Sequence, residues 1–597
     1  MVLLRKDGRI TSPPSTSAMD EDDRAEETAE LLQQRAQLTD SLLEQPYDLI
    51  LYLERAVVHR DLGYPDLAAG DSYRALLLTD EVCDESFEYH EQALTALLAH
   101  SSDRLPAVLR GHGGAYSGDD LSDELQDMNI DGVEEEVLVG RIYEPLELAH
   151  LASTRCYQIL AVSLLLCGCL RSAYEFCARG LTIAPDDEGL VQAMEYIQSM
   201  AKRRLKLPED VEVDVNILPE QGLVRREIYP WNDHEPDRFC DETLDFLNEE
   251  LRAVSTKCVA KVTELPALLE TNIDPNYRGA LPTSKQLGLF ASSDIEPGEL
   301  VLDEISVLTA NNRHRESLCD CCSNELPPLG ANSTVVGCPD CQDIMFCGED
   351  CLQRALATYH PAVCDKDLES IAKDGDPREA PNALYLLLLA RTLAMSCTQE
   401  IHPLELKEVK FIWGDFLPSA SNAVPLSVNA GPPPIWTLPF SFASNIEGPL
   451  HILEKMDIDI FAGIAQYDLW IFNTLYSKFR GTASARVSLR DARPEVAAVH
   501  PLWCLANHDC DPNVKWEWGG EMQFYCREQR VDGRPGGIRA GEEILNHYCD
   551  IDLPVRERRE WAKGSLGGLC MCARCRREAA EEEKVAVNGK KYHDVEV

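Results

Sequence analysis

Cysteine and histidine residues recur at metal-ligand spacings between residues 319 and 364. Two thiolates separated by two residues lie on one side of a tight turn and supply half of a tetrahedral zinc site, so the other half must come from another pair. The chain holds 23 cysteines, and pairs this close favour metal ligation over disulfides. Two closed zinc sites are therefore expected. The eight candidate ligands are Cys319, Cys322, Cys338, Cys341, Cys347, Cys351, His360 and Cys364.

A second set of residues suits group transfer. The segment Asn507-His508-Asp509-Cys510 is followed by Gly541-Glu542-Glu543-Ile544 and then by Tyr548, and Gly288-Leu289 lies far upstream of all three. A glycine allows a ligand to approach the backbone closely. A single buried tyrosine is more often a packed aromatic whose hydroxyl is hydrogen-bonded. The order of these segments, rather than any one residue, is what points to a site.

These segments resemble the opening and closing motifs of SET-domain lysine methyltransferases, and the run Cys570, Cys572 and Cys575 resembles their post-SET zinc segment. The cysteine pairs between residues 319 and 364 resemble a MYND zinc finger. A SET domain interrupted by a MYND finger is the arrangement of the SET and MYND domain-containing (SMYD-type) family. The resemblance covers residues 287–575.

The resemblance implies an enzyme that moves a methyl group from S-adenosylmethionine to a lysine amine. Such a site must align the two reactants and keep the amine uncharged, so positioning does most of the work. Free lysine has a pKa near ~10.4, which an apolar channel would lower. By resemblance Tyr548 is the catalytic residue. The expected cofactor-binding residues are Gly288, Leu289, Asn507, His508 and Tyr548.

The resemblance also pairs the metal ligands. In the MYND pattern Cys319 and Cys322 join Cys347 and Cys351, whereas Cys338 and Cys341 join His360 and Cys364. Cys321 is an alternative to Cys322, which we prefer because it keeps the two-residue spacing. Cys510 would complete the post-SET site with Cys570, Cys572 and Cys575. About three zinc ions are expected.

Two departures from the family pattern favour weaker cofactor binding. Gln286 stands where many members have the first glycine of a Gly-x-Gly loop. The run Leu566-Gly567-Gly568-Leu569 has no aromatic residue before Cys570, and a lost aromatic contact is worth ~0.5–1.5 kcal/mol.

We expect a multidomain α+β protein. TPR-like α-helical repeats come first, followed by a β-rich SET domain that is split by the finger and a helical insertion and closed by the post-SET segment. The expected divisions are a disordered acidic tail (1–28), the TPR-like region (29–206), a connecting segment (207–275), the first SET part (276–318), the finger (319–364), the insertion (365–487), the SET core (488–552), the post-SET segment (553–578) and a C-terminal tail (579–597).

Local patterns predict particular elements. Apolar residues at helical spacing predict insertion helices at 382–395 and 460–479, separated by a proline-rich loop around Pro432-Pro433-Pro434. Further helices are expected at 88–100 and 188–204, beside an acidic loop at 111–136. Short strands are expected at 299–302 and 522–525. The TPR-like region would either bind peptides or form a layer that supports the SET lobe, and the sequence leaves both open.

Charge limits the partners. With 56 Lys and Arg against 102 Asp and Glu, the net charge of −46 disfavours direct nucleic-acid binding. It serves either solubility or the attraction of basic protein substrates. No membrane span or export signal is expected, and the compartment is cytoplasmic, nuclear or both.

Two functions remain at this stage. The first is a protein-lysine N-methyltransferase with a histone or non-histone substrate. The second is a catalytically weak interaction scaffold that binds peptide partners through the MYND finger or the TPR groove.

Overall fold

The computed structural model describes residues 21–593, apart from 103, 111–141, 209, 269–278, 280, 313–317, 329, 331–332, 342, 369–379, 414–436 and 488–493. The expected acidic loop at 111–136 and the Pro432 to Pro434 loop lie outside the described residues. None of the described helices combines the length and apolarity that a bilayer crossing requires.

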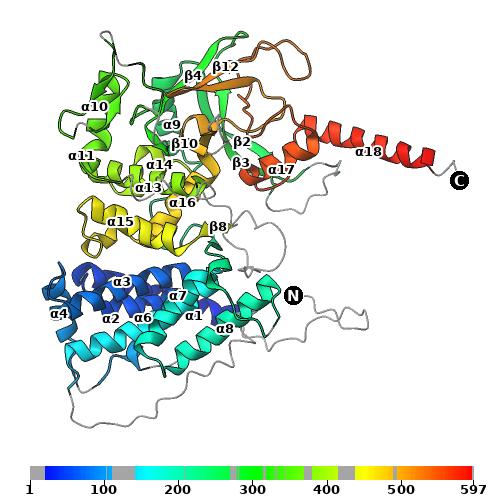
Figure 1. Ribbon diagram of the computed structural model, residues 1–597. Coiled ribbons are helices and arrows are strands. Elements are labelled where there is room, and N and C mark those ends of the chain that lie inside the picture. The colour runs from blue at the N-terminus through cyan, green and yellow to red at the C-terminus, as the bar shows by residue number, and fades with distance from the viewer. Residues whose placement is uncertain are drawn as a thin grey trace.

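The N-terminal part is a layer of paired helices at the bottom of Figure 1. Asp48 begins the second helix by accepting hydrogen bonds from the N–H groups of Ile50 and Leu51. Gly180 permits a close helix contact, since a Cβ there would lie 2.8 Å from the Cβ of Tyr157. The helices are α1 (Glu21–Glu44), α2 (Leu49–Asp61), α3 (Pro65–Cys83), α4 (His90–Leu98), η1 (Ala107–Leu109), α6 (Pro145–Cys167), α7 (Leu170–Ile183) and α8 (Glu188–Leu205). The helices expected at 88–100 and 188–204 are confirmed as α4 and α8.

The β-rich part forms the upper lobe of Figure 1. Strands β2 (Cys258–Pro266) and β3 (Thr283–Ala291) pair antiparallel, with Gly288 opposite Lys261. Strand β12 (Glu521–Cys526) pairs with both β4 (Leu300–Ile305) and β11 (Val514–Trp518), which confirms the strands expected at 299–302 and 522–525. The third sheet joins β5 (Leu308–Asn311), β10 (Pro494–Val499) and β9 (Ser484–Val487).

Smaller elements complete the chain. They are η2 (Val215–Ile217), β1 (Gly222–Arg225), α9 (Asp241–Val254), β6 (Val336–Gly337), β7 (Met345–Phe346), α10 (Glu349–Thr358), α11 (His360–Val363), η4 (Pro403–Glu405), α14 (Lys407–Lys410), β8 (Thr437–Phe440), η5 (Ala443–Glu447), α15 (Gly448–Lys455), η7 (Trp503–Leu505), α17 (Val555–Leu566) and α18 (Ala573–His593). Strand β1 pairs with β8, so the segment before the SET part is tied to the insertion.

The insertion is mainly helical, with one change from the expectation. Helix α13 (Ala380–Gln399) confirms the helix at 382–395. The second helix, α16 (Leu469–Thr482), begins nine residues later than expected, because Asp468 caps it by accepting the N–H of Leu469. The residues before Asp468 instead form the short turn η6 (Ala462–Ala465).

Three expected boundaries also differ. Helix α1 begins at Glu21, so the acidic tail that was expected to be disordered to residue 28 is helical from residue 21. The connecting segment contains β2, which provides the pairing partner of the first SET strand. The C-terminal tail continues the post-SET segment as α18, which projects from the body of the molecule in Figure 1.

One hydrophobic core runs from the N-terminal helices through the insertion to the cysteine-rich segment 319–364. The ring of Phe461 lies among Tyr47, Tyr52 and Tyr89, at centroid distances of 5.9, 6.4 and 5.6 Å. The helical layer therefore holds a segment of its own chain, which favours the supporting role over the peptide-binding role.

Buried charges cross the same interface. Arg55, which is fully buried, lies 2.6 Å from an oxygen of Asp71 and 3.2 Å from an oxygen of Asp468. Arg74 is 3.5 Å from Asp468 and donates a hydrogen bond to the carbonyl of Tyr467. These buried charges pair across the interface, so the network helps to fix how the insertion docks onto the helices.

Replacement of Asp468 by alanine is expected to destabilise the protein by about 3–5 kcal/mol, because it leaves buried arginine charge uncompensated. Denaturant unfolding of the full chain measures this. Asp457→Ala is the matched control, since Asp457 is 82% exposed and its contact with Lys366 lies at the surface. Equal stability of the two variants would show that the buried network is not holding the interface.

Candidate active site

The two closing segments lie side by side. His508 pairs with Asn546 in a parallel bridge. The N–H of Asn546 donates to the carbonyl of Asn507 at 2.8 Å, and the N–H of Asp509 donates to the carbonyl of Asn546 at 2.8 Å. Residues 39 positions apart in the sequence, Asn507 and Asn546, are thereby held in fixed register.

The contact between residues 507–510 and 544–548, called the crossing below, is stabilised by the side chain of Asn513. Its amide nitrogen donates to the carbonyl of Glu543 at 2.8 Å, and its amide oxygen accepts the N–H of Leu545 at 2.7 Å. Asn513 is 4% exposed, so both bonds are shielded from water. Asn513 is not among the predicted site residues.

Gly288 lies against the crossing. The side-chain amide of Asn507 donates to the carbonyl of Leu287 at 2.9 Å and to a carboxylate oxygen of Glu543 at 2.8 Å. A Cβ on Gly288 would lie 2.6 Å from that oxygen of Glu543 and 3.0 Å from the amide nitrogen of Asn507. Glycine at position 288 therefore lets β3 approach the two closing segments without displacing either side chain.

Gly288→Ala should displace Glu543 and Asn507 and lower stability by about 1–3 kcal/mol, as overpacking does. It should also abolish binding of any ligand that needs Asn507 in place. Thermal unfolding and ligand titration measure the two effects. Gly519→Ala is the control, because a Cβ there meets nothing within 4 Å. A Gly288→Ala variant that behaves like the control would contradict this geometry.

Tyr548 contacts the segment that contains Asn507. Its hydroxyl donates to the carbonyl of Ala506 at 2.8 Å, directly before Asn507. Burial, followed by the nearby Cys504 and Glu543, raises the pKa of Tyr548 far above its usual value. The phenol is therefore protonated at neutral pH, and its oxygen keeps lone pairs that can accept a hydrogen bond.

His508 links Tyr548 to the nearest thiol cluster. The N–H of Tyr548 donates to Nδ1 of His508 at 2.9 Å, while Nε2 lies 3.4 Å from Sγ of Cys510. Because Nδ1 accepts, the neutral ring carries its proton on Nε2 and points it at the sulfur. Both ring nitrogens are thus engaged within the chain, so His508 has only its backbone left for a cofactor.

Leu289 has a different place from its neighbours. Its side chain is fully buried in the SET core, and its carbonyl accepts the N–H of Ile544 at 2.7 Å. The side chain of Leu289 therefore packs beside the site, and its expected contact with the cofactor stays a prediction.

Glu304 on β4 holds the turn that leads into the site, and it was not predicted as a site residue. Its two carboxylate oxygens accept the N–H groups of Leu502 and Trp503, at 3.1 and 2.7 Å, where η7 begins. That turn leads directly into Ala506 and Asn507. No spacing in the sequence distinguishes Glu304 from the other glutamates, because its partners lie almost two hundred residues away.

Burial raises the pKa of Glu304 to about 7, although the two N–H groups oppose the shift. An unfolded glutamate has a pKa near ~4.3, so between these values the folded state binds more protons than the unfolded state. The part of the stability that comes from Glu304 should therefore fall as pH rises from about 4.3 to 7. Urea unfolding across this range should show a shallower fall for Glu304→Gln, and identical slopes would contradict the assignment.

Three thiol clusters have the predicted membership. They are Cys319, Cys322, Cys347 and Cys351; Cys338, Cys341, His360 and Cys364; and Cys510, Cys570, Cys572 and Cys575, with the ligand atoms of each cluster within 4.8 Å of one another. Zinc–sulfur bonds of ~2.3 Å at tetrahedral angles place sulfurs about 3.8 Å apart. The sulfurs of Cys322 and Cys347 are 3.9 Å apart, those of Cys338 and Cys364 3.8 Å, and those of Cys510 and Cys570 3.9 Å. The donor sets therefore fit zinc.

The cluster around Cys510 is anchored to the SET core. Arg574 donates to the carbonyls of Cys510 and Ile551, and Arg559 donates to the carbonyl of Cys570. These bonds tie the segment after residue 566 to the crossing that positions Tyr548.

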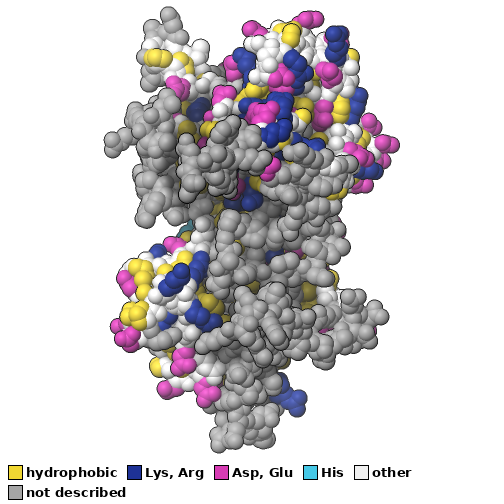
Figure 2. Space-filling model, turned by 90° about the vertical axis from the view of Figure 1, so that its right-hand side faces the viewer, with side chains coloured by type: hydrophobic (Ala, Val, Ile, Leu, Met, Phe, Trp, Pro, Cys, Tyr) yellow, Lys and Arg dark blue, Asp and Glu magenta, His cyan; other side chains and the backbone are white. Residues whose placement is uncertain are grey.

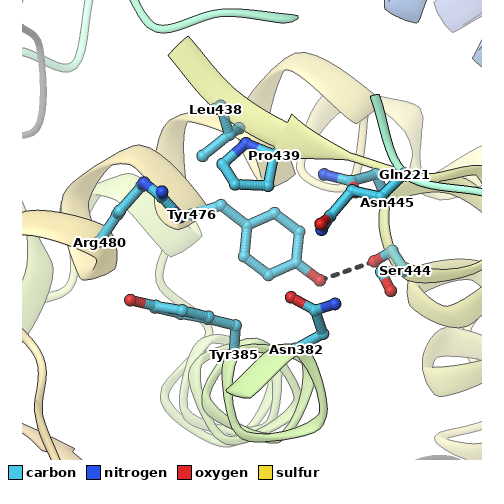
Figure 3. A pocket seen from close by; sticks show the side chains of 9 residues that line it. All are labelled: Gln221, Asn382, Tyr385, Leu438, Pro439, Ser444, Asn445, Tyr476 and Arg480. Atoms are coloured by element: carbon cyan, nitrogen blue, oxygen red, sulfur yellow. Dashed lines mark hydrogen bonds between the residues drawn. The ribbon is translucent and has the colours of Figure 1, made fainter. Parts of the chain in front are cut away.

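A separate small pocket lies between α13, β8 and α16 (Figure 3). The hydroxyl of Tyr476 donates to the carbonyl of Ser444 on its wall. Tyr385 and Arg480 also line it, and none of the predicted cofactor or metal residues does.

Comparison with known proteins agrees with this geometry. Residues 286–549 match the SET domain family model. The chain is 24% identical over 346 residues to the SET domain-containing protein SmydA-8, isoform B, of Drosophila melanogaster, covering 55% of this chain and 65% of that protein. It is 22% identical over 295 residues to the histone-lysine N-methyltransferase ASHR1 of Arabidopsis thaliana, covering 49% and 53%.

A shorter match of 91 residues is 28% identical to the N-lysine methyltransferase SMYD2 of Homo sapiens, covering 15% of this chain and 19% of that protein. The chain thus spans less than two thirds of the length of each of these relatives. Together with the crossing of residues 507–510 and 544–548, the family match shows that the chain contains a SET domain.

Proposed function

We propose that this chain is an S-adenosylmethionine-dependent protein-lysine N-methyltransferase of the SET and MYND type. One observation carries the proposal. The phenol of Tyr548 donates a hydrogen bond to the residue before Asn507, and the side chain of Asn507 donates a hydrogen bond to the residue before Gly288. Three distant segments thereby meet at a protonated hydroxyl, as alignment of a methyl donor and an amine requires.

The described residues fit the cofactor. Within the described part of the chain, the peptide N–H and C=O of His508 take part in none of the hydrogen bonds that surround them, so both can serve a ligand. Gly288 is buried, and it contributes by letting the side chains of Asn507 and Glu543 lie directly against its backbone. Gly288, Asn507 and the backbone of His508 would hold S-adenosylmethionine, which supplies an electrophilic methyl group on a sulfonium.

Tyr548 would position the incoming lysine. Its hydroxyl proton is committed to Ala506, so its oxygen can only accept, and an uncharged amine can donate one N–H to it. That bond directs the amine lone pair away from the phenol. The imidazole of His508 fixes the backbone of Tyr548, and Glu304 and Asn513 fix the segments on either side. No general base is needed if the amine arrives neutral.

We further propose that the three thiol clusters hold structural zinc, two in a MYND finger and one in a post-SET segment. The post-SET zinc would lock α17 and α18 next to the crossing. Each site has four protein ligands, which leaves no open position for metal chemistry.

The substrate would be a protein lysine, in a histone or a non-histone protein. The face in Figure 2 shows Lys and Arg interspersed with Asp and Glu over its described part, so the net charge of −46 is not one unbroken acidic surface there. Basic substrates would then gain mainly in encounter rate, and their apparent affinity should weaken as salt rises.

The proposal is tested by incubating the full chain with radiolabelled S-adenosylmethionine and a cell extract. We expect labelled protein bands in which the methyl group lies on lysine, identified by acid hydrolysis and mass spectrometry. Label on cysteine or arginine, or no label despite cofactor binding, would contradict a lysine methyltransferase.

A further inference from the structure

Cys510 belongs to two overlapping groups of potential metal ligands. One is the predicted set with Cys570, Cys572 and Cys575, and the other joins Cys510 to His508 and Cys549. A four-coordinate zinc bound to four thiolates has no place for a fifth. When the predicted set is filled, Cys549 is left as a metal-free thiol whose sulfur lies within 4.8 Å of that of Cys510.

Cys549 is unlike an ordinary core cysteine. It is 4% exposed and packs in the same small cluster as Cys510, Cys570 and Cys575, not in the large SET core. It directly follows Tyr548, and Cys510 lies two residues after His508, so the two sulfurs come from the two segments that form the crossing. A bond between them would join those segments covalently.

We propose that Cys549 and Cys510 form a peroxide-sensitive thiol pair whose disulfide opens the post-SET metal site. The thiolate sulfur of Cys510 attacks one oxygen of hydrogen peroxide, the O–O bond breaks, and sulfenic acid and hydroxide are formed. The sulfur of Cys549 then attacks the sulfenic sulfur, and the disulfide forms as hydroxide leaves. Cys510 is already deprotonated as a zinc ligand, so one hydroxide takes the proton of Cys549 and the other takes a proton from solvent. One thiolate, one thiol, one proton and one peroxide thus give one disulfide and two waters.

The surroundings of Cys510 suit this chemistry. Nε2 of His508 lies 3.4 Å from its sulfur and points an N–H at it, and Arg558 lies against the neighbouring sulfur of Cys575 at 3.7 Å. A zinc-bound cysteine is a thiolate, which is the nucleophilic form of the side chain. His508 and Cys572 are both partly exposed, so solvent reaches the edge of the cluster, whereas Cys510 itself is fully buried.

The disulfide would remove one of four zinc ligands. Three thiolates hold the metal more weakly, so zinc should leave and the anchoring of α17 and α18 should loosen. This inference rests on the proposed post-SET zinc site and not on methyl transfer. Its test therefore reads out zinc and sulfur chemistry.

The zinc-loaded full chain should be treated with hydrogen peroxide in the presence of a chromogenic zinc chelator. Free thiols are then alkylated and the peptides mapped by mass spectrometry. We expect about one zinc released per chain in an early phase, together with a peptide pair joined through Cys510 and Cys549. Cys549→Ser should bind as much zinc as the natural chain and release it several-fold more slowly.

Cys240→Ser is the matched control, because Cys240 is a partly exposed cysteine outside all three clusters, and it should leave the early phase unchanged. Linkage of Cys510 only to Cys570, Cys572 or Cys575 would overturn the proposal. So would early zinc release from Cys549→Ser at the natural rate. Should Cys549→Ser fail to fold, the peptide map of the natural chain decides alone.

Discussion

Tyr548→Phe is expected to lower methyl transfer by roughly 10²–10³-fold while the affinity for S-adenosylmethionine stays nearly the same. The loss follows because the phenol oxygen is the group that would orient the amine, and loss of a preorganised polar group at a reacting centre has an effect of this size. The ring itself keeps its contact with His508, at 5.3 Å between centroids, so the fold should survive.

Single-turnover transfer from radiolabelled cofactor to a protein acceptor measures the chemical step, and titration with the cofactor measures binding. Tyr525→Phe is the matched control. Its hydroxyl bonds Gln523 on the same strand, away from the crossing, and its loss should not change the rate. Unaltered turnover in Tyr548→Phe would remove Tyr548 from its proposed role.

Cys570→Ser is expected to remove one of about three zinc ions per chain and to uncouple the post-SET segment. Cys570 is 2% exposed and its sulfur lies 3.9 Å from that of Cys510, so serine leaves a buried site with three thiolates. Because structural zinc contributes folding energy directly, the loss should also lower thermal stability and expose α17 and α18 to proteolysis.

Elemental analysis of the purified chain checks the count. The natural chain should contain close to three zinc ions, Cys570→Ser close to two, and Cys240→Ser again three. A natural chain with two zinc ions would remove one proposed site, and a Cys570→Ser chain that keeps the natural content would show that Cys570 is not a ligand.

The sequence predicted the elements whose cause is local or motif-bound. Helix α13 follows from an unbroken apolar run, and β4 and β12 follow from short β-rich runs. The members of the three clusters were predicted from the cysteine spacing and the order of the family motifs. The two-residue spacing was the reason to prefer Cys322 over Cys321 as a ligand. The meeting of Gly288, Asn507 and Tyr548 followed from the family resemblance and not from any periodicity.

What could not be predicted depends on partners far away in the chain. The apolar pattern continues through Asp468, yet α16 begins there. The carboxylate of Asp468 caps the helix and also pairs with Arg55, which lies 413 positions earlier in the chain. In the sequence Glu304 does not differ from other acidic residues. Its role follows only from the hydrogen bonds that it accepts from Leu502 and Trp503 in the fold. The N-terminal region was predicted to be helical, with TPR-like repeats that stay a prediction, but its packing against Phe461 could be seen only in the fold.

The most direct test of the account is a calorimetric titration of the zinc-loaded chain with S-adenosylhomocysteine, the product that the proposed reaction leaves behind. We predict saturable binding with one site per chain, which Gly288→Ala abolishes and Gly519→Ala preserves. Absence of binding at millimolar ligand would contradict the claim that residues 288, 507, 508 and 548 form a methyl-donor site.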